Sequence, residues 1–287
     1  MQAVVVFENP GPNFLSVGKS NLPLMFFSAG IIFALALILW SCLLYRSSGD
    51  RFVIHYLMLL LVLFKTLQEF FNALTLHFVQ IRGYPVGWNV VYYLFTFLNG
   101  LLMFVVILLV GAGWSLLKPF LQPREKRILT IILPLQIVAN IASIYVGSAA
   151  PGSMAWMTWR DIFTLVDIIC CATVLFPLMW SLKNLRESAK DDKMNFDLIK
   201  LKQFQHFYIL VVSYIYFSRI VVYLLESTMP YRLDWVSVMS PELATFIFYV
   251  TSGYYFRPVP NNPYLTVSHF DEESEDEETA SFGTVEE

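Results

Sequence analysis

Five ionisable side chains lie within long apolar runs of this 287-residue chain: Lys65, Glu69, Asp167, Arg219 and Glu242. On scales of membrane insertion such a side chain costs about 2.5–3.5 kcal/mol, so it normally faces a partner or a water-filled cavity. Lys65 and Glu69 are four residues apart, which places them on one face of a helix and lets them pair. Arg219 has two candidate partners, Asp167 and Glu242, and a bidentate contact with either carboxylate is geometrically reasonable. These residues therefore predict charge pairing inside the membrane, and a ligand-binding cavity is one interpretation of them.

The sequence shows no catalytic, metal-binding or cofactor pattern. An intramembrane aspartyl protease needs two catalytic aspartates, and no second aspartate lies within an apolar run as Asp167 does. A zinc site needs several ligands at suitable spacing, which the histidines near the ends of apolar runs do not have: His55, His77 and His206. The cysteines also lie in apolar runs, without a disulfide or zinc pattern: Cys42, Cys170 and Cys171. We expect a protein that is not an enzyme and that carries no metal, no cofactor and no nucleic acid.

The composition indicates that most of the chain lies in a membrane. Hydrophobic residues make up 57% and charged residues only 14% of the chain, and the mean hydropathy is +0.59. A soluble domain carries about 25% charged residues. A soluble globule of this length could not bury so much apolar surface, which excludes an ordinary cytosolic enzyme.

A membrane-spanning helix needs about 20 mostly apolar residues. Seven segments meet this requirement and predict an all-α, seven-helix transmembrane bundle: 22–45, 52–78, 88–117, 128–147, 160–182, 204–227 and 235–256. With the N-terminus in the lumen, the cytosolic segments hold 13 basic residues and the lumenal segments hold 4. By the positive-inside rule this asymmetry predicts a lumenal N-terminus and a cytosolic C-terminus.

The ionisable residues form a polar band when their depth is counted at about 1.5 Å per residue from the lumenal ends of these helices. They then lie roughly 10–20 Å deep, and two amides join them, Asn99 and Asn140. The band has three interpretations. It is an ion-pair network that sets the helix register, a polar cavity that receives a charged or hydrogen-bonding group of a ligand, or an ion or proton path.

The charges divide the chain into three parts. Residues 1–21 form a short lumenal remnant and residues 22–256 form the bundle, with a long charged cytosolic loop at 183–203. Residues 257–287 form an acidic cytosolic tail with one basic and nine acidic residues, which we expect to be disordered.

The tail contains seven carboxylates around one serine: Asp271, Glu272, Glu273, Ser274, Glu275, Asp276, Glu277 and Glu278. One interpretation is a solubilising tail. The other is an acidic-cluster sorting signal that cytosolic coat adaptors read, including clathrin adaptors. Glu277 follows Ser274 by three residues, which suits an acid-directed kinase, and a phosphate would add about −1.5 to −2 charges.

Several segments together resemble one family. They are LVGAGWS at 109–115, ILPLQIVAN at 132–140, VDIICC at 166–171 with LFP at 175–177, YIYFSRI at 214–220, GYYFRP at 253–258 and NPYL at 262–265. In this order they resemble the lung seven-transmembrane receptor (LUSTR) family, which is grouped with the Golgi-localised GOST proteins. The similarity is strongest to the orphan-receptor branch with an acidic tail. Family members usually carry a lumenal β-sandwich before the first helix, so we expect that domain to be missing here, as in a short isoform, a partial gene model or a fragment.

The resemblance implies a receptor-like protein of the Golgi apparatus and trans-Golgi network, with endosomes and the plasma membrane as further locations. It implies a role in vesicle-mediated transport, including endocytosis and endosome-to-Golgi retrieval. The bundle of such proteins is similar to that of Wntless, a carrier of lipidated cargo, and Asp167, Arg219 and Glu242 would fall in its polar core. The expected partners are membrane lipids or membrane-bound cargo. One alternative is a signalling receptor that engages a G protein through loop 183–203, and a second is a cation channel.

Overall fold

The computed structural model describes residues 13–47, 53–111, 206–207, 209–230 and 233–258, with single residues at 134, 137, 138, 141, 162, 165 and 169. Its elements are all helical, which confirms the predicted all-α class for this part of the chain. They are η1 (Val17–Lys19), α1 (Leu22–Arg46), α2 (Val53–Arg82), α3 (Trp88–Gly111), η2 (Phe217–Val221), α7 (Val222–Thr228) and α8 (Asp234–Tyr255). The spans expected at 128–147 and 160–182 lie almost entirely outside the described residues.

Three helical stretches among the described residues are long and apolar enough to cross a membrane: Val17–Arg46, Val53–Arg82 and Trp88–Ile107. Large apolar side chains on the outer face of α1 are exposed, including Leu24, Leu35, Ile38 and Leu39. An exposed apolar face of this length is unfavourable in water but suits the hydrocarbon of a bilayer.

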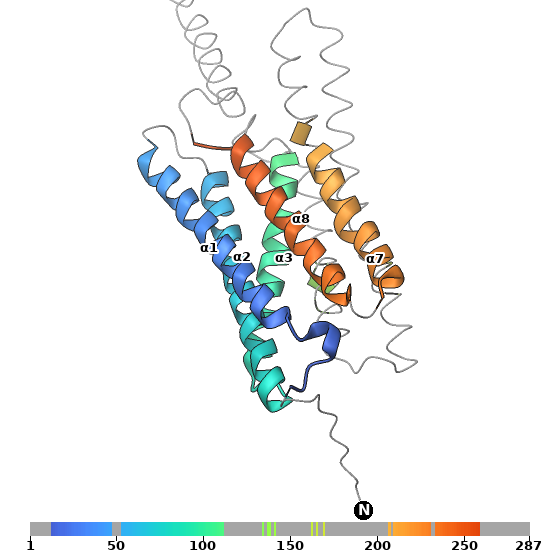
Figure 1. Cartoon of the computed structure of the whole chain (residues 1–287). Coiled ribbons are helices and arrows are strands. Elements are labelled where there is room, and N and C mark those ends of the chain that lie inside the picture. Colours follow the sequence, from blue (N-terminus) through green and yellow to red (C-terminus); the bar gives the residue numbers. More distant parts are fainter. Residues whose placement is uncertain are drawn as a thin grey trace, which may run out of the picture.

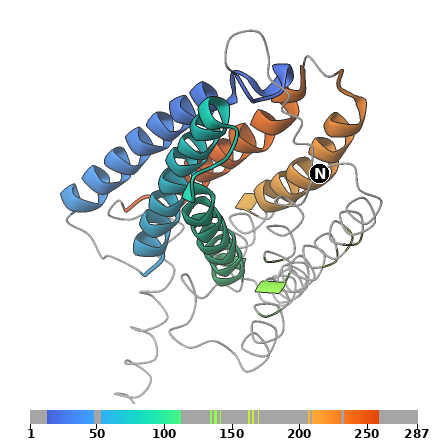
Figure 2. The ribbon, with the colours of Figure 1, turned by 90° about the horizontal axis from the view of Figure 1, so that it is seen from below.

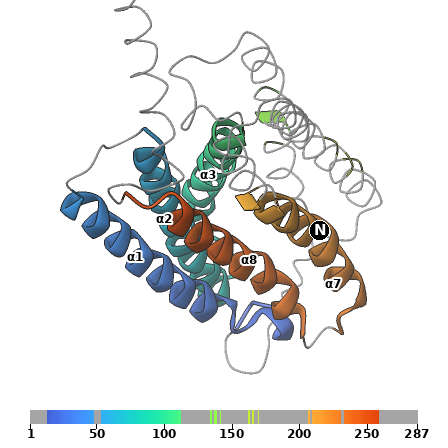
Figure 3. The same ribbon diagram turned by 90° about the horizontal axis from the view of Figure 1, so that it is seen from above.

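The helices lie side by side along a common direction (Figure 1). Helix α2 packs between α1 and α3, and α8 contacts both α1 and α7. Seen from below and from above, α2 again lies between α1 and α3 (Figure 2 and Figure 3). Helices α1 and α8 run in the same direction, and α2 runs opposite to them. The C-terminal ends of α1 and α8 therefore lie at the end of the bundle where α2 begins (Figure 1).

One apolar cluster holds these helices together. Its members come from α1, α2, α3, α8 and the segment before η2, and include Phe33, Ile54, Val106, Val211 and Phe248. Aromatic rings reinforce the α2–α3 contact, since Phe71 stacks on Phe95 with ring centroids 5.4 Å apart. Helix α1 approaches α2 closely at Gly30, where a Cβ atom would lie 3.1 Å from the ring of Phe70.

The end of the bundle where α2 ends and α8 begins is closed by the chain before α1. The N–H of Phe14 donates a hydrogen bond to the carbonyl of Gln80 at 3.1 Å. Lys19 Nζ lies 3.7 Å from Asp234 Oδ2 at the start of α8. The hydrogen bond from Phe14 supports the last turn of α2, which continues to Arg82 rather than ending at the predicted residue 78.

Two irregularities interrupt the regular helices near the polar residues. Residues Phe217–Val221 form a π-helical turn that contains Arg219, and such turns are frequent at functional sites. Helix α8 contains Pro241 directly before Glu242. A proline lacks the N–H that would otherwise donate to the carbonyl of Ser237, four residues earlier. Here Thr245 Oγ1 donates to the Pro241 carbonyl at 2.8 Å.

Candidate functional site

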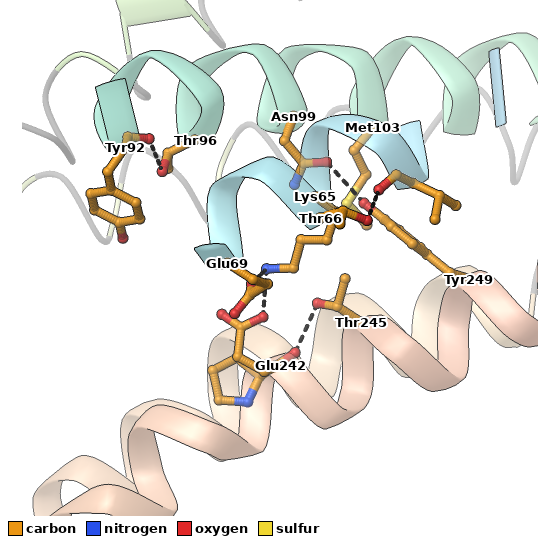
Figure 4. Close-up of polar contacts among 12 residues, drawn as sticks. Lys65, Thr66, Glu69, Tyr92, Thr96, Asn99, Met103, Glu242, Thr245 and Tyr249 are labelled. Atoms are coloured by element: carbon orange, nitrogen blue, oxygen red, sulfur yellow. Dashed lines mark hydrogen bonds and ion pairs between the residues drawn. The ribbon is translucent and has the colours of Figure 1, made fainter. Parts of the chain in front are cut away.

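Three charged side chains meet between α2 and α8. Lys65 Nζ lies 2.6 Å from Glu69 Oε1 and 2.5 Å from Glu242 Oε2 (Figure 4). The side chains of Lys65 and Glu69 are 4% and 1% exposed, whereas that of Glu242 is 18% exposed. We call Lys65, Glu69 and Glu242 the charge cluster.

Each member of the charge cluster is placed by a local feature of its helix. Lys65 and Glu69 are one turn apart on α2, so one face of that helix supplies both. Glu242 reaches them from α8, just after Pro241. On the α1 side the Lys65 ammonium lies 5.7 Å from the ring centroid of Phe33, which is within the range of a cation–π interaction. Three helices therefore enclose one cation.

The charge cluster has more acceptors than donors. With all three groups ionised, one positive charge faces two negative charges. The second carboxylate oxygen of Glu69, Oε2, is buried and accepts no hydrogen bond from the residues that the structure describes. A buried polar atom without a hydrogen bond is costly. The cluster is thus chemically suited to a proton, a cation or a hydrogen-bond donor.

A second polar layer follows on the same face of α8. Tyr249 Oη donates to Asn99 Oδ1 of α3 at 3.1 Å (Figure 4). Tyr214 Oη lies 3.2 Å from Thr245 Oγ1 and 3.6 Å from the sulfur of Met103. These hydroxyl groups link α8 to α3 and to the helix before η2, and they extend the polar band beyond its charged members.

The sequence prediction of the site did not include Tyr214, Thr245 or Tyr249. A signal for two of them was present, because Glu242, Thr245 and Tyr249 follow one another at helical spacing on one face of α8. The chain contains 15 tyrosines, so a single tyrosine gives little information without its neighbours.

The structure brings four of the predicted residues into the polar region. Lys65, Glu69 and Glu242 form the charge cluster, and Asn99 accepts from Tyr249. Lys65 and Glu69 pair as their spacing indicates, and Glu242 also contacts Lys65; its expected pairing with Arg219 stays a prediction. Asn140, Asp167 and the tail residues 271–278 lie outside the described residues, as does the side chain of Arg219.

Two hollows are open to the surface of the bundle. One lies between α1, α2 and α8 and includes Phe33, and the other lies between α1 and α2 near Ser20 and His77. None of the charge-cluster residues lines either hollow. Over the described ranges, no three His, Cys, Asp or Glu side chains are placed to hold a metal ion.

Comparison with known proteins agrees with this architecture. Residues 22–263 match the family model described as the seven-transmembrane domain of GOST proteins. A protein of Arabidopsis thaliana named candidate G-protein coupled receptor 6 is 38% identical over 268 residues, which are 93% of this chain and 63% of that protein. The chain thus spans less than two thirds of the length of this relative. It is a multi-pass, receptor-like membrane protein with seven transmembrane helices, and it belongs to the GOST family, in line with the LUSTR/GOST resemblance of its motifs.

Proposed function

We propose that this protein acts in vesicle traffic at the Golgi apparatus and trans-Golgi network, as a carrier or sorting receptor for a membrane-bound or lipid-bearing cargo. In this proposal the bundle holds a polar group of the cargo at the charge cluster and releases it without a chemical step. Cytosolic coat adaptors, including those of clathrin, recruit the loaded protein through the acidic tail, and the protein returns from endosomes by retrieval.

The charge cluster is the observation that carries this proposal. Replacing a buried ion pair by apolar residues of similar volume is often neutral or stabilising, so helix packing alone does not require charge here. With all three groups ionised the cluster carries one excess negative charge, and a buried Glu69 oxygen accepts no hydrogen bond from any described residue. These features suit a site that accepts a hydrogen-bond donor or a cationic group, because that partner would supply what the helices leave out.

Complementation with two matched variants tests the proposal. In cells that lack the protein, the wild-type chain, Glu242→Gln and Asp234→Asn are expressed at equal levels, and the surface membrane proteome is quantified. Glu242→Gln removes one charge from the cluster without changing the size of the side chain. Asp234→Asn makes the same chemical change on the same helix, at a pair with Lys19 that is substantially exposed and therefore contributes little.

The carrier proposal expects loss of the protein to alter the surface level of specific membrane proteins. Wild type and Asp234→Asn restore those levels, and Glu242→Gln does not. Full restoration by Glu242→Gln would contradict a role for the charge cluster in cargo transport, and an unchanged proteome in the cells that lack the protein would contradict the carrier role itself.

A second candidate function is signalling through a G protein, and the name of the Arabidopsis relative favours it. It predicts ligand-dependent nucleotide exchange in membranes that contain the chain. The exchange should be lost when the loop residues Lys200 and Lys202 are both changed to Gln and should not depend on the acidic tail. The carrier proposal expects no difference in exchange between membranes with and without the chain.

A further inference from the structure

A hollow of about 420 Å³ lies between α1 and α8, with α2 beneath it, at the end of the bundle where α1 and α8 end. We call it the α1/α8 groove. Its floor consists of buried apolar residues, among them Phe33, Met58 and Phe248. Leu39 and Val250 on its rim are 65% and 50% exposed. The groove therefore opens sideways onto the apolar outer face of the bundle, where lipid chains lie.

Two polar residues, Ser252 and Arg257, line this otherwise mostly apolar groove. Arg257 follows α8 and is exposed, and its guanidinium lies 4.8 Å from the ring centroid of Tyr254 on the rim. Ser252 lies in the groove wall, and its buried hydroxyl has no hydrogen-bond partner in the described part of the chain. Other hydroxyls of α8 donate to carbonyls of their own helix, as Ser237 and Ser240 do at 2.7 Å. Ser252 is thus a buried donor that the groove presents to an occupant.

The spacing of these two groups matches the polar parts of a phospholipid. Arg257 follows Ser252 by five positions, which corresponds to about 7.5 Å along a helix. The interfacial layer of a bilayer is roughly 5–7.5 Å thick on each side, the difference between its core and its full thickness. A headgroup phosphate at Arg257 would place the ester carbonyls of the same lipid near Ser252, and one acyl chain would continue into the groove.

The charge at this end favours an anionic headgroup. Arg46 ends α1 and Arg257 follows α8, so both helices carry a basic side chain at this end. Basic pockets between transmembrane helices on the cytosolic side bind anionic headgroups. The topology predicted from the basic residues places this end in the cytosol.

We propose that the α1/α8 groove binds an anionic phospholipid of the cytosolic leaflet. One acyl chain fills the groove, Ser252 Oγ donates a hydrogen bond to an ester carbonyl, and Arg257 pairs with the phosphate. None of the charge-cluster residues lines the groove, so this proposal does not require that the cluster binds cargo.

Trp40 lies in the groove wall and reports its occupancy. The full chain is reconstituted in vesicles of phosphatidylcholine that contain increasing fractions of phosphatidylserine or phosphatidylcholine with brominated acyl chains, since bromine quenches indole fluorescence on contact. The Trp40 signal is the difference between the wild type and Trp40→Phe. We expect brominated phosphatidylserine to reach half-quenching at about fivefold lower mole fraction than brominated phosphatidylcholine, which corresponds to the ~1 kcal/mol that one basic side chain contributes near an anionic surface.

Three variants and one control locate the bound lipid. For each of them the Trp40 signal is the difference in fluorescence between that variant with Trp40 and the same variant with Trp40→Phe. Arg257→Gln should abolish the preference for phosphatidylserine, and Ser252→Ala should weaken quenching by both lipids. Ala36→Phe should fill the groove and reduce quenching, whereas Ile38→Phe, at an exposed position of α1 that does not line the groove, should not. Equal quenching by the two lipids, a preference that survives Arg257→Gln, or no quenching by either lipid would each overturn the proposal.

Discussion

Lys65 is the residue on which the polar centre of the bundle depends. It contacts carboxylates from two helices and lies close to the ring of Phe33 on a third. Breaking a buried ion pair by removing one partner costs about 3–5 kcal/mol, because the remaining charge stays buried without compensation. Here the loss of Lys65 would leave two carboxylates facing each other.

Lys65→Met should therefore lower the midpoint of thermal unfolding of the purified full chain substantially. The triple variant Lys65→Met, Glu69→Gln, Glu242→Gln should recover most of the loss, since it removes the charges together. Lys19→Met serves as the control, because the pair of Lys19 with Asp234 is 48% and 33% exposed and such pairs contribute about 0–1 kcal/mol. Size-exclusion chromatography of the heated protein measures each midpoint. A triple variant as unstable as Lys65→Met would contradict this account of the charge cluster.

The pairing of Lys65 with Glu69 follows from the sequence, but the third member of the charge cluster does not. Counted from the ends of their helices, Lys65 in α2 is about 26 Å deep and Glu242 in α8 about 12 Å deep. The two side chains nevertheless meet, because α2 extends beyond the start of α8 (Figure 1). Helical spacing relates residues within one helix, whereas the relative heights of two helices depend on tertiary packing.

The contact between α1 and α2 depends on the absence of a side chain at Gly30. A Cβ atom there would lie 3.1 Å from the ring of Phe70, which itself packs edge to face against Phe27 with centroids 5.8 Å apart. Small residues allow transmembrane helices to approach closely, and van der Waals contact then provides much of their association.

Gly30→Ala should lower the thermal midpoint, because either the Phe70 ring or the α1 backbone must move. In a Phe70→Leu background the same substitution should cost clearly less, which a double-mutant cycle measures as a coupling energy of about 0.5–3 kcal/mol. Ser28→Ala on the exposed face of the same helix should change the midpoint little. Equal effects of Gly30→Ala in the two backgrounds would argue against this contact.

The sequence predicts which segments form helices better than it predicts where those helices end or become irregular. Hydropathy and turn residues predicted helices at 22–45, 52–78 and 235–256, beside the observed Leu22–Arg46, Val53–Arg82 and Asp234–Tyr255. The last turn of α2 contains Gln80 and Arg82, which hydropathy counts against a span, but contacts from the preceding chain support it. The π-helical turn at Phe217–Val221 has no equivalent signal in the sequence.

Across the whole molecule, the charged residues fall into three groups, which lie in the loops, inside the bundle and in the C-terminal tail. Thirteen basic residues predict the topology, the charge cluster lies inside the bundle, and nine acidic residues concentrate in residues 257–287. The seven-helix architecture could be predicted from hydropathy and from the family motifs. The identity of a cargo could not be, because the polar band combines residues from several helices whose relative positions no local pattern encodes.

Deletion of residues 271–278 should move the protein from the perinuclear Golgi toward endosomes or the cell surface, because it removes the seven carboxylates proposed to recruit coat adaptors. Deletion of residues 279–286 removes the same length of tail with only one acidic residue and should leave the distribution unchanged. Quantitative imaging of the tagged full chain measures both. If the two deletions give the same distribution, the tail acts by length or solubility and not as a sorting signal.

The central claim is that the charge cluster holds a polar group of a membrane-bound cargo, and co-purification tests it most directly. The wild-type chain, Glu242→Gln and Asp234→Asn are purified from native membranes in mild detergent, and bound proteins and lipids are quantified by mass spectrometry. Losing one charge-assisted hydrogen bond weakens binding by about 1.5–3 kcal/mol, roughly a tenfold change or more. We predict at least one membrane-bound species that wild type and Asp234→Asn retain equally and that Glu242→Gln retains about tenfold less. Identical retention of every bound species by the three proteins would contradict the claim.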